Sequence, residues 1–117
     1  MDYNEVFRFK TKEFAVEIIE IFSELKYTDA ISIVRKQIIR SATSIAANYR
    51  AMCRARSDKE RFAKLSIVVE EADETLFWLE IAAEMNILPI ETLNQLKEKA
   101  TEILKATSTY RKKLSNF

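Results

Sequence analysis

Residues 44–62 read SIAANYRAMCRARSDKERF, and the interpretation of the whole fold starts from them. They pass from small residues with helical periodicity into a cluster of arginines and lysines, without a glycine that would end the helix. Ser57 and Glu60 then form the S-x-x-E pattern of a capping box, which satisfies free N–H groups at a helix start. We therefore interpret this stretch as the end of one helix, a tight turn, and the start of the next.

The composition of the chain is that of a helical protein. Among its 117 residues there is no glycine and one proline, whereas 48% are hydrophobic and 32% are charged. Sheet proteins need many turns, and turns favour residues that tolerate positive φ. A chain without glycine is therefore expected to consist of long helices with few connections. Its length suits a single domain, residues 1–117, with a core of its own.

Apolar residues recur at intervals of three and four in four segments, which predicts four amphipathic helices. Thr28 is the expected N-cap of the second helix, and Pro89 is expected in the first turn of the fourth. Short connections make consecutive helices antiparallel. The predicted fold is an all-α, up-down-up-down four-helix bundle, with helices at residues 3–26, 29–54, 58–86 and 89–113.

The predicted core seams leave one polar residue and several apolar ones in unusual places. Asn48 falls on the seam of the second helix, where it needs hydrogen-bond partners and is expected to set the helix register rather than bind a ligand. The seam predicted for the third helix is Phe62, Leu65, Val69, Ala72, Leu76, Leu79 and Ala83. Three large residues lie off that seam and are predicted to form an oligomer interface, because large exposed apolar patches are uncommon on monomers: Phe77, Trp78 and Ile81.

The sequence lacks the residues that usually carry out acid–base catalysis, metal binding and phosphate binding. The chain has no histidine, the commonest general base and metal ligand, and no glycine for a phosphate-binding loop. Cys53 is alone, so we expect neither a Cys-rich zinc site nor a disulfide, and we interpret it as a small packed residue. We expect a non-enzymatic protein without a metal or cofactor. With no run of 18 apolar residues and no apolar leader, a cytoplasmic location is expected.

Charge is predicted to separate in the folded chain although the net charge is only +1. In an up-down bundle, residues 1–13, 50–64 and 111–117 meet at one end, with 12 basic and five acidic side chains. Clustered Lys and Arg suit a polyanion because they release counterions from phosphates, although many such clusters are only solvated surface. The candidate nucleic-acid-binding residues are Arg50, Arg54, Arg56, Lys59, Arg61, Lys64, Arg111, Lys112 and Lys113.

Residues 70–74, EEADE, form an acidic run on the third predicted helix. The pattern E-E-x-x-E is half of the Mg²⁺ site of all-helical nucleotide pyrophosphohydrolases, and this enzyme class is one alternative function. Those enzymes also need E-x-x-D on a following helix, and no aspartate follows Glu74. We instead expect its acids to form ion pairs with the second helix or with a neighbouring subunit. The expected pairs join Glu70, Glu71, Asp73 and Glu74 to Arg35, Lys36 and Arg40, with Arg40 roughly opposite Glu70 and Asp73.

Residues 40–83 resemble a family of four-helix-bundle proteins that includes the 23S rRNA intervening-sequence proteins, also labelled S23 ribosomal protein. The residues that carry the resemblance are Ser44, Ile45, Asn48, Arg56, Ser57, Glu60 and Phe62. The chain departs from many members at Ala51 and Met52, where they have Glu-Gly.

This resemblance implies a homopentamer that associates with RNA or DNA. Relatives include intervening-sequence products and the accessory protein of diversity-generating retroelements, which works with a reverse transcriptase. A shared fold does not guarantee a shared role, so a structural module that binds another protein is the second alternative function.

Overall fold

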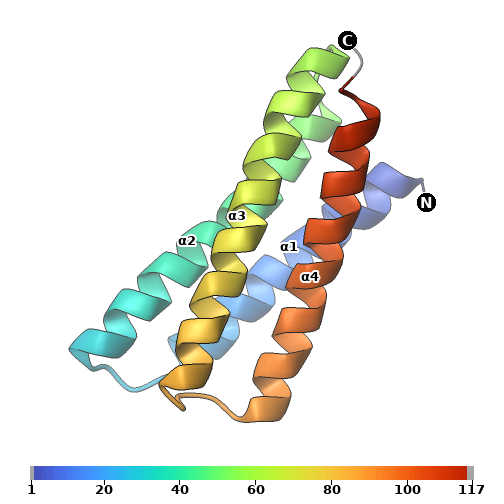
Figure 1. The fold of residues 1–117 in the computed structure, drawn as a ribbon. Helices are drawn as coiled ribbons and strands as arrows, with labels where there is room; N and C mark the ends of the chain where they lie inside the picture. Colours follow the sequence, from blue (N-terminus) through green and yellow to red (C-terminus); the bar gives the residue numbers. More distant parts are fainter. Residues whose placement is uncertain (1, 116–117) are drawn as a thin grey trace.

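The computed structural model describes residues 2–115, and within that range it contains four α-helices and no strand (Figure 1). The helices are α1 (Tyr3–Ser23), α2 (Asp29–Cys53), α3 (Asp58–Glu84) and α4 (Ile90–Lys113). Their number and order confirm the sequence-based prediction. In this part of the chain no helix is long and apolar enough to cross a membrane.

The helices form an elongated antiparallel bundle of 46 × 26 × 19 Å. Figure 1 places both ends of the chain and the α2–α3 turn at one end, with the other two loops at the opposite end. Two ion pairs join α1 to α4 in opposite chain order, Lys10 with Glu102 at 3.1 Å and Glu17 with Lys99 at 2.9 Å. Consecutive helices therefore run up, down, up and down as predicted.

Helix boundaries differ from the prediction by at most three residues, and specific contacts explain the differences. The Arg35 guanidinium on α2 donates hydrogen bonds to the carbonyl oxygens of Phe22 and Leu25, at 3.2 and 2.9 Å, and so closes the end of α1 early. Asn86 has φ of 54° and stops α3 in the left-handed conformation that glycine usually supplies. Pro89 is the N-cap of α4 rather than a residue of its first turn.

The closest helix pair is α2 with α3, whereas α1 and α4 make the least contact of the neighbouring pairs. Small buried residues face each other where α2 and α3 pack, and the Ser41 and Thr75 hydroxyls are joined by a hydrogen bond of 2.8 Å. Each hydroxyl also bonds a carbonyl of its own helix. Burying these hydroxyls therefore leaves neither without a partner.

The buried seams of α2 and α3 differ from the predicted ones at some positions and agree at the others. On α2 the buried residue is Tyr49, and Asn48 beside it is only half-buried. On α3 the predicted Leu65, Ala72 and Leu79 are buried. The seam otherwise runs through Val68, Thr75 and Ala82, whereas the predicted Val69, Leu76 and Ala83 lie half-buried at its edge. An apolar stripe that is wide on the helix surface permits either choice, and the packing against α2 selects one.

Side-chain caps hold the starts of the first three helices, as the sequence predicts for α2 and α3. The Thr28 hydroxyl accepts a hydrogen bond from the Ile31 N–H at 3.0 Å, and Ser57 accepts one from Glu60 at 3.1 Å. The Glu60 carboxylate reaches back to the N–H of Arg56, one residue before the cap, at 3.3 Å. The capping box therefore stabilises the α2–α3 turn as well as the helix start.

Replacing Ser57 with alanine should lower the free energy of unfolding by about 1 kcal/mol, because the Glu60 N–H loses its acceptor. Replacing it with aspartate should retain most of that stability, since a carboxylate accepts the same bond. Urea unfolding followed by circular dichroism would measure both. Equal urea midpoints for Ser57→Ala and the unmodified chain would contradict the role of the cap.

Candidate nucleic-acid interface

Three segments that are far apart in sequence meet at the end of the bundle that holds the α2–α3 turn. The rings of Tyr3 and Tyr110 lie 5.7 Å apart, and the Cys53 thiol lies 3.9 Å from the Asn4 carbonyl oxygen. The Arg111 guanidinium lies over the Phe62 ring, 5.9 Å from its centroid. The meeting of the two ends of the chain with the turn confirms the arrangement expected from the up-down topology. We call this part of the molecule the basic end.

Most of the predicted cations at the basic end are exposed and unpaired. Among residues 2–115, seven of these residues have a charged side-chain group that forms no ion pair and donates no hydrogen bond: Arg50, Arg54, Arg56, Lys59, Lys64, Lys112 and Lys113. Lys64 is half-buried, and the other six are exposed. Like charges therefore gather here without internal neutralisation, which leaves them available to an external polyanion.

Arg61 differs from these cations because it holds the turn together. Its guanidinium pairs with Asp58 at 2.8 Å and donates to the Ala55 carbonyl oxygen at 3.2 Å. The sequence pattern grouped Arg61 with the binding residues because a linear sequence does not show these contacts. Arg61 is therefore a structural residue of the turn, and Arg111, half-buried against Phe62, is also partly engaged.

Two grooves flank the last turns of α2 at the basic end. The groove between α1 and α2 has a volume of about 650 Å³, and the groove between α2 and α3 about 550 Å³. Both are bordered by Ala47, Arg50 and Arg54, which form a ridge between them. Small alanine side chains on α2 leave the grooves open, so a chain-like ligand can approach the helix backbone closely.

The sequence-based site omitted three residues of α1 that line the first groove. Arg8 and Lys12 add two exposed cations, and Phe9 adds an exposed aromatic ring. Lys12 is four residues after Arg8 and three after Phe9, so the three side chains lie on one side of α1. This helical spacing is the sequence signal that could have identified them. The neighbouring Lys10 instead pairs with Glu102.

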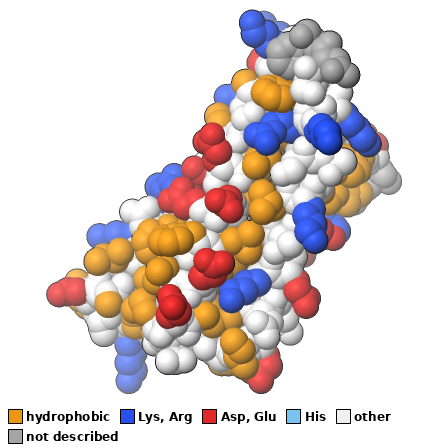
Figure 2. All heavy atoms as spheres, viewed as in Figure 1, with side chains coloured by type: hydrophobic (Ala, Val, Ile, Leu, Met, Phe, Trp, Pro, Cys, Tyr) orange, Lys and Arg blue, Asp and Glu red, His pale blue; other side chains and the backbone are white. Residues whose placement is uncertain are grey.

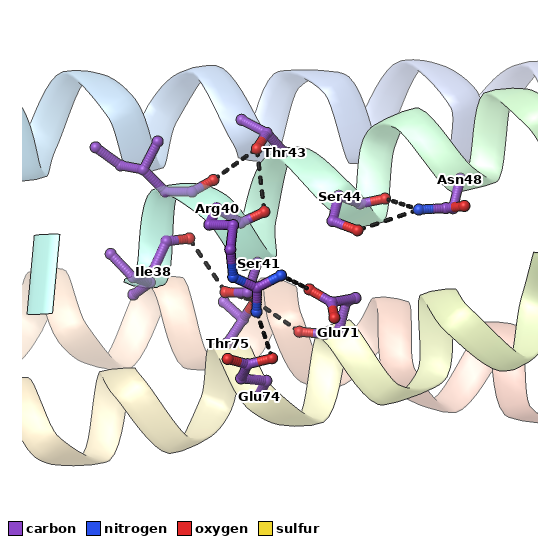
Figure 3. Close-up of polar contacts among 10 residues, drawn as sticks. Ile38, Arg40, Ser41, Thr43, Ser44, Asn48, Glu71, Glu74 and Thr75 are labelled. Carbon is purple, nitrogen blue, oxygen red and sulfur yellow. Dashed lines mark hydrogen bonds and ion pairs between the residues drawn. The ribbon is translucent and has the colours of Figure 1, made fainter. Parts of the chain in front are cut away.

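Arg40 forms the main ionic contact between α2 and α3, with two of the four acids of the run (Figure 3). Its guanidinium lies 3.2 Å from Glu71 and 2.6 Å from Glu74. Glu70 and Asp73, predicted roughly opposite Arg40, are exposed on a different side of α3. The prediction of an ion pair between Arg40 and the acidic run is right. Of its four acids, Glu71 and Glu74 face Arg40, because the buried seam of α3 runs through Val68 and Thr75 rather than Val69 and Leu76.

The two partners of Arg40 respond differently to the same guanidinium. Burial raises the pKa of the Glu71 carboxyl, and Arg40 only partly opposes that effect. The hydrogen bond from Arg40 lowers the pKa of the more exposed Glu74. Trp78 Nε1 is buried without a hydrogen bond of good geometry, although its N–H also helps to lower the pKa of Glu74.

The acidic run does not converge into a metal-binding cluster. Within residues 2–115, no group of three or more Asp, Glu, His or Cys side chains is arranged to hold a metal ion. The two acids that face α2 contact a guanidinium, which occupies the position a cation would take (Figure 3). The arrangement therefore favours a structural use of residues 70–74.

Asn48 does not join two helices. Its amide donates to the carbonyl and the hydroxyl oxygens of Ser44, one turn earlier on α2, at 2.9 and 3.1 Å (Figure 3). The expectation that it sets the register between helices is therefore wrong, because Tyr49 takes the buried position. The buried Ser41–Thr75 pair makes the polar contact between α2 and α3 instead.

Phe77, Trp78 and Ile81 divide into one exposed and two partly buried residues. The Phe77 side chain is 49% exposed, and its ring packs edge-on against Trp78 with centroids 5.0 Å apart. Trp78 and Ile81 pack against the core. In the view of Figure 2, hydrophobic side chains gather over the lower part of the molecule between acidic groups. Phe77 is thus the part of this group most accessible to a partner.

Cys53 and Tyr49 are packing residues at the inner side of the basic end. Burial raises the pKa of the Cys53 thiol, which makes the thiolate less available, and burial also raises the pKa of the Tyr49 hydroxyl. The Tyr49 hydroxyl is buried and has no hydrogen-bond partner among the described residues. Cys53 packs against the core, and this position and its raised thiol pKa agree with the prediction that it is a packed side chain and not a nucleophile.

The likeness to known proteins extends over nearly the whole chain. The family model described as 23S rRNA-intervening sequence protein matches residues 5–109. The chain belongs to this family. A crystal structure of a protein of unknown function from the S23 ribosomal protein family, from Bacteroides thetaiotaomicron, is 33% identical and has a TM-score of 0.84. The likeness covers 93% of this chain and 97% of that one. No curated protein matches the chain.

Replacing Arg40 with alanine should lower the free energy of unfolding at neutral pH by about 1 kcal/mol, because Glu71 keeps its buried charge without a partner. The double change Arg40→Ala and Glu71→Gln should recover most of this loss. Urea unfolding of the three proteins would measure both effects.

Acidification should narrow the difference in the free energy of unfolding between the Arg40→Ala variant and the unmodified chain. The pKa of Glu71 is raised in the folded chain, so folding favours its protonated form. The charge on Glu71 therefore destabilises the fold as pH rises through that pKa, and this loss of stability disappears as pH falls. Glu74 has a lowered pKa, and the stability it adds in the unmodified chain is lost as pH falls through it. A difference in the free energy of unfolding that widens from about pH 7 to about pH 4 would contradict the proposed roles of Glu71 and Glu74 as partners of Arg40.

Proposed function

We propose that this member of the 23S rRNA-intervening sequence protein family is a non-enzymatic homo-oligomer that binds RNA or DNA through phosphate contacts at its basic end. The supporting observation is the set of unpaired cations on the last turns of α2 and the following turn, with Arg50, Arg54 and Arg56 at its centre. Phosphates are the ligands that such a cluster suits, since each contact releases condensed counterions.

The rigidity of the turn supports this proposal over an ordinary solvated loop. Ser57, Glu60 and Arg61 hold the turn by capping and by contacts to Ala55 and Asp58. The cations therefore stand on helices and a fixed turn, where their spacing is preserved when a ligand binds. Such contacts are made to the backbone of a nucleic acid and should tolerate any base sequence.

Oligomerisation would repeat this surface. In a cyclic assembly, such as the pentamer that the family resemblance implies, identical basic ends lie on one face around the axis. Several weak contacts to one nucleic acid then act together through effective concentration. The exposed Phe77 ring, beside Trp78, is the proposed subunit contact.

Changing Arg50, Arg54 and Arg56 together to glutamate should abolish retention of RNA and duplex DNA in a filter-binding titration. Each side chain is exposed and unpaired within the described part of the chain, so the helical circular dichroism spectrum should be unchanged. The unmodified protein should lose affinity steeply between two salt concentrations, by about 0.7 to 0.9 logarithmic units per phosphate contact for each tenfold rise in salt.

The matched control changes three lysines away from the basic end, Lys26, Lys36 and Lys97, to glutamate and alters the net charge equally. This lysine variant should bind RNA and duplex DNA more tightly than the triple arginine variant. If both triple variants are folded and bind RNA and duplex DNA equally well, the proposed nucleic-acid function is refuted. It would leave the protein-interaction module as the explanation.

Replacing Phe77 with glutamate should reduce the mass measured by light scattering at tens of micromolar protein, because a charge is expensive to bury in a subunit contact. Phe77 is the better test residue, since Trp78 packs against the core and its loss would also affect folding. Glu80→Gln, an exposed change on the same helix, is the control. An unmodified chain that is monomeric at this concentration would refute the assembly.

A further inference from the structure

The groove between α1 and α2 contains an exposed aromatic ring among cations. Phe9 is 58% exposed, whereas Phe7 and Phe14 of the same helix are buried in the core. Phe9 is therefore not part of the core, and more than half of its surface is open to solvent. Four basic side chains line the same groove: Arg8, Lys12, Arg50 and Arg54. A ring in this setting suits a ligand that has both an aromatic face and negative charge.

The four cations stand in two pairs on opposite sides of the groove. Arg8 and Lys12 are about one turn apart on α1, and Arg50 and Arg54 are about one turn apart on α2, so each pair spans about 6 Å. None of the four has an ion pair or side-chain hydrogen bond with another residue of the 2–115 range. Glu5 is the acidic side chain that lines the groove, so positive charge dominates.

We infer that this groove binds single-stranded nucleic acid, with one base stacked on Phe9 and neighbouring phosphates on Arg8, Lys12, Arg50 and Arg54; the inference rests on the proposed function. A single strand offers free base faces, and stacking on an aromatic side chain combined with a basic channel is how such strands are bound without sequence preference. In a duplex the base faces cover one another, so Phe9 has nothing to stack on. The floor of Ala46 and Ala47 leaves room for the strand.

Fluorescence-anisotropy titrations with labelled oligo(dT), oligo(rU) and a duplex of equal length would test this inference. An oligonucleotide of about 12 nucleotides suits the size of such sites. Phe9→Ala should weaken single-strand binding roughly 5- to 100-fold and leave duplex binding unchanged, because only a stacked base is lost. Phe9→Tyr should bind like the unmodified protein. Val16→Ala, another exposed apolar residue of α1, is the control and should change neither.

Salt dependence separates the ring from the cations. Phe9→Ala should leave the slope of log affinity against log salt unchanged, since no phosphate contact is removed. Arg8→Gln should lower that slope by about 0.7 for one lost contact with a single strand. Thermal unfolding of each variant, expected to match that of the unmodified protein, would show that the binding losses do not come from unfolding.

The outcomes for the two proposals are separate. The inference is supported if the protein binds a single strand more tightly than the duplex and if Phe9→Ala weakens the single-strand binding. Either oligo(dT) or oligo(rU) can give this result. Single-strand binding that Phe9→Ala leaves unchanged, or duplex binding that is tighter, overturns the inference while the proposed function stands. An unmodified protein that binds no nucleic acid overturns both. Binding of poly-glutamate as tight as that of the oligonucleotides would show that the groove selects charge alone, and it would also overturn the inference.

Discussion

The close packing of α2 against α3 is the constraint on which the rest of the structure depends. Ser41 and Thr75 meet in the buried contact between these helices, and Ala42 and Ala72 are fully buried side chains of the same two helices. Small side chains let the two backbones approach, and the shared hydrogen bond removes the cost of burying two hydroxyls. Because both hydroxyls also bond their own helices, the contact fits one register. That register determines which residues of α3 face α2 and which lie at the turn.

Charge separation follows from this register. Arg40 is beside Ser41 and meets Glu71 and Glu74, so part of the acidic run is neutralised within the bundle. Arg50 lies ten residues further along α2, about 15 Å away, which exceeds the screening length at physiological salt. The acids of residues 70–74 therefore have little influence on the cations near the turn, where Asp58 pairs with Arg61 and Glu60 caps the start of α3. One helix thus carries an internally paired arginine and, beyond it, arginines that face only solvent.

The location of the candidate binding surface is also a consequence of the packing. The α1–α4 side is the most open part of the bundle, but the cations gather instead along the last turns of α2 and on the residues beside them. Alanines at the surface of α2 make this region a pair of shallow grooves rather than a closed cavity. A shallow basic groove on rigid helices fits a long polyanion better than a small substrate, which is usually enclosed.

The sequence by itself determined the elements of this protein. The absence of glycine, the three-four periodicity and the capping residues Thr28 and Ser57 are local properties, and they predict four helices with their order and approximate ends. The meeting of the basic segments at one end also follows, because short loops force antiparallel neighbours. Only the tertiary structure decided which residues share a face. The α3 seam runs through Val68 and Thr75 rather than Val69 and Leu76, which places Glu71 and Glu74 beside Arg40 in place of Glu70 and Asp73. Likewise, α1 brought Arg8, Phe9 and Lys12 to the groove. These outcomes depend on contacts between helices, because a wide apolar stripe allows several rotations and packing selects one.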